Sequence, residues 1–113
     1  MRRVEFYCTR GSPSFIFDGS TITSRGVGGA EYGFITVTEE MASRGWEVIV
    51  YNQPPNGAVK INSVQYIEVE KFDLQAKHDI FVLFRNPMPQ ITKVDARRRI
   101  FWSCDQFTEG NYQ

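Results

Sequence analysis

The sequence predicts an α/β fold with an open, mostly parallel, twisted sheet and flanking helices, and three observations support this prediction. Short apolar runs rich in β-forming residues recur along the chain, at residues 4–8, 47–51 and 79–84. A glycine-rich stretch and an amphipathic pattern separate the first two runs. Strand-like segments alternate with helical or loop segments, an arrangement that favours parallel strands joined by right-handed crossovers.

The first expected strand covers about Arg3–Cys8, and a long connection, Thr9–Arg25, follows it. A connection of this length without secondary structure is unusual in a compact domain and is more often functional than incidental. The apolar triplet Phe15-Ile16-Phe17 within it predicts either a hairpin arm or a segment that packs under the next helix.

The next expected element is a helix that starts at the glycine-rich stretch Gly26–Glu31. Downstream, residues that can form one buried helix face recur at three- and four-residue steps: Phe34, Val37, Thr38, Met41 and Ala42. Gly45 is expected to end the helix, because glycine adopts a left-handed cap without strain. The run Glu47–Tyr51 then predicts a second strand, which completes a βαβ unit. Such a unit points the free N–H groups and the positive end of its helix at an arriving anion.

The second half of the chain predicts shorter elements. Three are expected in chain order: a turn at Gln53–Gly57, a strand nearer an edge at Val64–Val69, and one helical turn at Phe72–Lys77. The continuous apolar run Asp79–Phe84 predicts an inner parallel strand, covered on both faces. A brief helix is expected between Pro89 and Arg98, and a last, inner strand over Arg99–Cys104.

Length, charge and cysteine content limit the possible functions. A chain of 113 residues matches one domain, residues 1–113. Its 13 basic and 13 acidic side chains cancel, which argues against a nucleic-acid or membrane-surface protein. No apolar run is long enough for a signal-peptide core or a spanning helix, and we expect a cytoplasmic protein. Cys8 and Cys104 lack metal-ligand spacing, so we expect buried thiols and no metal site.

Gly28 and Gly29 are the first candidate site residues, because a loop without side chains at a helix start allows a phosphate or a sugar to approach the backbone closely. The alternative is that they only turn the chain. The stretch is not a dinucleotide fingerprint, since Glu31 stands where a third glycine is needed and no acidic residue ends the second strand. Glu31 itself either stabilises the first helical turn or binds a hydroxyl-rich ligand.

Asp105 and Cys104 form the second candidate group, at the carboxyl end of the last expected strand, where open α/β sheets bind ligands. Asp105 either orients a substrate hydroxyl or acts as a base, or it caps the following turn. Cys104 as a nucleophile would need a nearby base. The only histidine, His78, precedes the inner strand at its opposite end, and we expect it to be a surface or turn residue.

Several of these segments together resemble the opening of the GT-B glycosyltransferases of the group 1, family 4 type. That family shows Gly-Gly-x-Glu, a helix, then Arg-Gly-His-Glu-Val and a strand. The corresponding residues here are Gly28–Glu31 and Arg44–Val48, with Trp46 in the histidine position. Residues 79–82 and Ile100–Gln106 fit the two following inner strands, the last resembling a Trp-x-His-Asp-Gln pattern. The resemblance spans nearly all of this chain but only the first portion of the family's.

The resemblance implies a Rossmann-like N-terminal domain that faces the acceptor, while a second domain, missing here, binds the nucleotide-sugar. The chain would then be a fragment, inactive alone, with no cofactor or metal beyond the donor substrate. Gly28 and Gly29 would approach the donor diphosphate and sugar, and Cys104 would occupy the position of a histidine that contacts the sugar. A thiol is a weaker hydrogen-bond partner than an imidazole, so a non-catalytic α/β binding or scaffold module is the alternative. Aromatic surface left uncovered would promote self-association.

Overall fold

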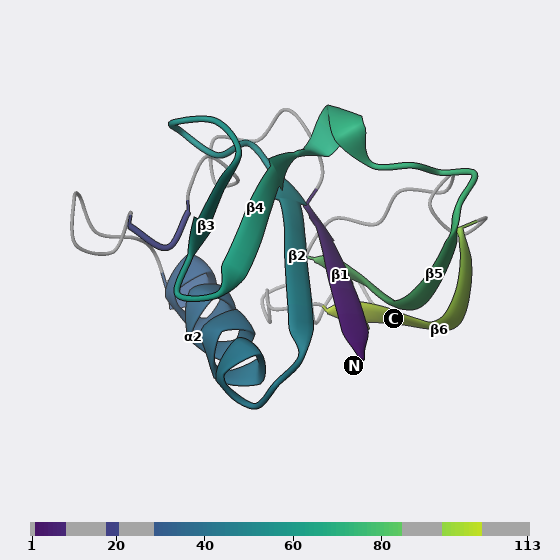
Figure 1. Cartoon of the computed structure of the whole chain (residues 1–113), viewed down its shortest axis with the longest axis horizontal. Helices are drawn as coiled ribbons and strands as arrows, with labels where there is room; N and C mark the ends of the chain where they lie inside the picture. The colour runs from purple at the N-terminus through teal and green to yellow at the C-terminus, as the bar shows by residue number, and fades with distance from the viewer. Residues whose placement is uncertain (1, 9–17, 21–28, 85–93, 103–113) are drawn as a thin grey trace, which may run out of the picture.

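The computed structural model describes residues 2–8, 18–20, 29–84 and 94–102. These residues form a mixed, six-stranded sheet and one α-helix, so the predicted α/β class is confirmed (Figure 1). The elements in chain order are β1 (Arg3–Cys8), α2 (Gly29–Ser43), β2 (Glu47–Asn52), β3 (Val59–Ile61), β4 (Val64–Glu68), the 3₁₀ turn η2 (Val69–Lys71), β5 (Lys77–Phe84) and β6 (Asp95–Trp102).

The strands lie in the order β3-β4-β2-β1-β5-β6, and only β3 is antiparallel to its neighbour. Strand β1 is central and pairs with β2 on one side and with β5 on the other. A two-residue turn joins β3 to β4, and both of its residues, Asn62 and Ser63, have positive φ. The amide of Asn62 donates a hydrogen bond to Glu39 of α2, at 2.9 Å, which ties this hairpin to the helix.

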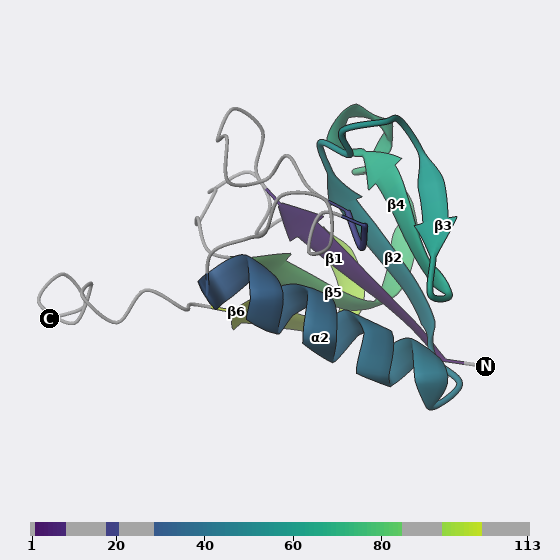
Figure 2. The ribbon, with the colours of Figure 1, turned by 90° about the vertical axis from the view of Figure 1, so that its left-hand side faces the viewer.

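Helix α2 lies across one face of the sheet (Figure 2). Phe34 and Ile35, both fully buried, are its main contacts with the core on that face. Side chains alternate along a strand, so Val4 and Phe6 of β1 also point to this face. The helix ends at Ser43, and Gly45 closes it in the left-handed conformation that the sequence predicts, with a φ of +96°.

The opposite face holds a second apolar cluster, built from alternate residues of β1, β2 and β5. Tyr7 and Tyr51 pack there against Phe72, which belongs to the connection between β4 and β5. The connection from β4 to β5 therefore covers the face that α2 leaves open. Strand β5 is added on the other side of β1 from β2 and β4, so a right-handed crossover to it passes over the opposite face of the sheet.

Strands β1, β2 and β5 confirm the sequence predictions, and β5 is an inner strand between β1 and β6. Cys8 is fully buried, as expected. Strand β3 was not predicted, and it occupies the edge next to β4. The predicted helical turn at 72–77 is wrong, since the 3₁₀ turn comes earlier, at Val69–Lys71.

The end of the described chain differs most from the prediction. The brief helix expected before Arg98 is wrong over residues 95–98, because these residues belong to β6 and pair with β5. Strand β6 is the last strand on its side of the described sheet, and most of its side chains are exposed, so the inner position expected for it is also wrong. The triplet Phe15-Ile16-Phe17 lies outside the described residues.

Within the described residues, we find no helix with the length and apolar content needed to cross a membrane.

Candidate functional site

The start of α2 lies at the edge of the sheet where the parallel strands end. Gly29 is the first residue of the helix, which runs back from the end of β1 to the beginning of β2. The ring of Phe34, in the second turn, lies 4.4 Å from that of Phe84 and 5.5 Å from that of Trp102 (centroid distances). Phe84 and Trp102 are the last residues of β5 and β6, so the helix start and these strand ends share one edge.

Of the site residues predicted from the sequence, two fall within the described part of the chain. Gly29 opens α2, and Glu31 lies in the first helical turn, where only its backbone is described. Gly28, Cys104 and Asp105 lie outside the described residues. Their contacts remain predictions, although Cys104 and Asp105 follow the end of β6 by only two and three positions.

Two amide side chains at the same edge were not predicted as site residues. Asn52, fully buried, ends β2, and Gln53 follows it directly. The side-chain oxygen of Gln53 is buried and has no hydrogen-bond partner among the described residues. A buried acceptor without a partner costs free energy unless a ligand or water satisfies it. The signal in the sequence was two consecutive polar residues immediately after an apolar strand.

A buried polar network occupies the face opposite α2. His78 Nδ1 lies 2.6 Å from Glu5 Oε1, and the Tyr51 hydroxyl donates to Glu5 Oε2 at 3.1 Å. The other ring nitrogen of His78 lies 2.9 Å from the carbonyl oxygen of Asp73, and the ring stacks on Phe72. The expectation that His78 is a surface or turn residue is therefore wrong. Strand β5 begins at Lys77, one residue before it, and the ring turns onto β1.

The chemistry of this network follows from its donors and acceptors. A carbonyl oxygen only accepts hydrogen bonds, so Nε2 of His78 is protonated and its N–H donates to the backbone carbonyl of Asp73. A second proton lies between Nδ1 of His78 and the Glu5 carboxyl group. Burial, together with the neighbouring Glu5 carboxylate, raises the pKa of Tyr51 to about 12, so its hydroxyl stays a neutral donor. The network joins β1, β2, β5 and the β4–β5 connection.

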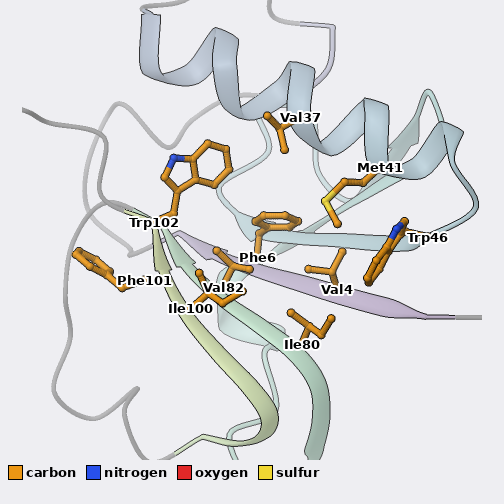
Figure 3. Close-up of a pocket in the computed structure, with 10 residues that line it drawn as sticks. All are labelled: Val4, Phe6, Val37, Met41, Trp46, Ile80, Val82, Ile100, Phe101 and Trp102. Carbon is orange, nitrogen blue, oxygen red and sulfur yellow. The ribbon is translucent and has the colours of Figure 1, made fainter.

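A cavity of about 510 Å³ lies between α2 and the β5–β6 side of the sheet (Figure 3). Its lining is apolar and includes Val37 and Met41 of α2, Ile80 and Val82 of β5, and Ile100 of β6. Both tryptophans of the chain, Trp46 and Trp102, also line it. Apart from the two indole N–H groups, the described side chains of this cavity offer nothing polar to a nucleotide or a sugar, in contrast to the carboxyl edge of the sheet.

Comparisons with known protein families, with curated proteins and with solved structures find no match to this chain.

Proposed function

We propose that this chain is the acceptor-side, N-terminal domain of a glycosyltransferase that moves a sugar from a nucleotide-sugar to a hydroxyl acceptor. One observation carries the proposal: Phe34 contacts Phe84 and Trp102, so the start of α2 and the carboxyl ends of β5 and β6 meet at one edge. The chain does not transfer sugar alone, because the resemblance assigns nucleotide-sugar binding mainly to a second domain.

The order of the parallel strands supports a Rossmann-like half of a GT-B fold. Going outward from β1, the chain builds β2 and β4 on one side, then β5 and β6 on the other. Doubly wound sheets have this order, and their ligands bind outside the carboxyl ends of the two strands where the direction of winding reverses. In this sheet those strands are β1 and β5.

The proposed chemistry is electrostatic. The first N–H groups of α2, at Gly29 and the following residue, have no helical partner, and the helix dipole is positive there. With Gly28 they form a cradle for the diphosphate that departs with the nucleotide, and stabilising its charge lowers the barrier to transfer. Glu31, Asp105 and the unpartnered oxygen of Gln53 supply acceptors for sugar or acceptor hydroxyls, while Cys104 takes the family's histidine position.

Amide NMR titration with UDP-glucose and with GDP-mannose tests this proposal. We expect weak binding at millimolar ligand, with shifts in the first turn of α2 and at the ends of β1 and β5. Gly29→Val should remove the shifts while the fold is kept, and Gly33→Ala, one turn later in open space, should not. Absence of shifts, or shifts at the opposite edge of the sheet, would contradict the proposal. In a longer chain that carries the second domain, Gly29→Val should also lower turnover.

A non-catalytic α/β binding module is the second candidate function. The cavity beside α2 favours it, because its lining is apolar and suits a hydrophobic partner rather than a sugar. A folded protein that shows no shift with either nucleotide-sugar would favour this candidate.

A further inference from the structure

We propose that the cavity beside α2 is a docking groove for an amphipathic helix of a partner polypeptide, whose C-terminal end carries acidic residues. The groove is the space lined by Val37, Met41, Ile80, Val82, Ile100 and Trp102. This inference goes beyond the proposed function, because the groove lies on a face of the sheet and the nucleotide-sugar is assigned to its carboxyl edge.

Exposed apolar side chains gather at this groove. Val37, Ile100 and Phe101 come from two elements, are all exposed, and all line the same cavity. Figure 3 shows Val37 and Met41 pointing from the helix toward the strands that carry Ile80 and Ile100. A continuous apolar surface of this kind marks an interaction site.

The architecture indicates a helix as the occupant. A sheet in an α/β fold is covered by helices on each face, and α2 covers the part of its face around β2 and β4. The β4–β5 connection packs on the opposite face through Val69 and Phe72. Among the described residues, no second helix covers β5 and β6 beside α2, and a helix lying parallel to α2 would fill that position.

The charges at one end of the groove select the partner's chemistry. Arg2 and Arg98 line a recess next to Ile80, at the edge where the strands begin. Arg97 in the same recess pairs with Asp79 at 3.3 Å, and the Arg2 guanidinium lies over the Trp46 ring, 5.5 Å from its centroid. Arg98 forms no ion pair with another described residue. A helix running antiparallel to the strands, as α2 does, places its C-terminal carbonyl groups at this edge. Those carbonyls and nearby acidic side chains complement the two arginines.

A second copy of this chain fits the groove poorly. The helix that the structure describes buries its large apolar side chains, Phe34 and Ile35, in its own core. Pairing of two β6 strands edge to edge would bring the consecutive arginines 97–99 of each copy together, and like charges oppose such pairing. The occupant is therefore not a second copy of this chain.

Titration with a designed peptide tests the proposal, with the two tryptophans as reporters. The probe is a peptide of about 18 residues, long enough to be helical, with leucines along one face and glutamates in its last turn. We expect a saturable blue shift of the tryptophan emission, because Trp46 and Trp102 both line the groove. A matched peptide with lysines in its last turn should bind about tenfold more weakly, since attraction to the arginines becomes repulsion.

Variants of the protein complete the test. Ile100→Glu should abolish binding, whereas Leu74→Glu should not, because Leu74 is as exposed as Ile100 (47% and 48%) but lies outside the groove. Arg98→Glu should reverse the preference between the two peptides. Binding that is unaffected by Ile100→Glu, no spectral change with either peptide, or a dimer that Ile100→Glu dissociates would each overturn the proposal. None of these outcomes depends on nucleotide-sugar binding.

Discussion

Removing one member of the buried Glu5–His78 pair should destabilise the protein about as much as removing both. The two side chains are only 3% and 5% exposed, and their atoms lie 2.6 Å apart. Glu5→Leu leaves His78 Nδ1 and the Tyr51 hydroxyl without their acceptor in a largely buried site. His78→Leu leaves the Glu5 carboxylate buried with Tyr51 as its remaining donor among these residues.

The structure sets the size of each effect. Breaking a buried pair by removing one partner costs about 3–5 kcal/mol. His78→Leu also loses the ring stack on Phe72, at 4.8 Å between centroids, a contact of about 0.5–1.5 kcal/mol. The double variant removes both partners of the pair and leaves only the Tyr51 hydroxyl and the Asp73 carbonyl to be satisfied, at about 1–3 kcal/mol each. We therefore expect a favourable coupling energy of about 4 kcal/mol between Glu5 and His78, because the lost ring stack counts equally in His78→Leu and in the double variant.

Urea unfolding of the four proteins of this cycle, followed by circular dichroism, measures the coupling energy. The exposed pair between Arg3 and Glu47, at 3.1 Å, provides the control cycle. Its coupling energy should stay below about 1 kcal/mol, because water screens it and mobile side chains must be ordered. Equal coupling in the two cycles, or a double variant as unstable as the sum of its singles, would refute the reasoning.

Three further predictions concern backbone conformation and pH. Gly45→Ala should destabilise the protein by about 1 kcal/mol, because the φ of +96° at Gly45 strains any side chain even in open space. Gly33→Ala should instead stabilise α2 by about 0.5–1 kcal/mol, and thermal melts of both variants check this contrast. Ser63→Gly should raise the melting temperature by about 4–8 °C, since glycine relieves about 1 kcal/mol at a φ of +68°, and an unchanged melt would contradict it. The raised pKa of Tyr51 means that the neutral phenol stabilises the fold fully below pH 10 and that this contribution is lost as the pH rises to about 12. Urea midpoints measured across that range should fall less in Tyr51→Phe, and Tyr32→Phe, at an exposed position, should behave like the unmodified protein.

The elements predicted correctly are those whose signals are local. The apolar runs of β1, β2 and β5 and the glycine that ends α2 each specify their own conformation. Strand β6 has no such signal over its first half, where residues 97–99 are three arginines. These residues are extended because they pair with β5, a contact that the local sequence does not contain.

The same distinction applies to the candidate sites. The βαβ pattern placed the start of α2 at the carboxyl edge of the sheet, because the order of strand, helix and strand determines that edge. The partner of His78 lies 73 residues away in the chain, and finding it requires knowing that β1 and β5 are neighbours. In the sequence, Glu5 is only a polar residue between apolar ones, the pattern of a strand with one face in water. In the folded protein the β4–β5 connection covers that face. Glu5 is therefore a buried acid, and it needs His78 and Tyr51 as hydrogen-bond partners.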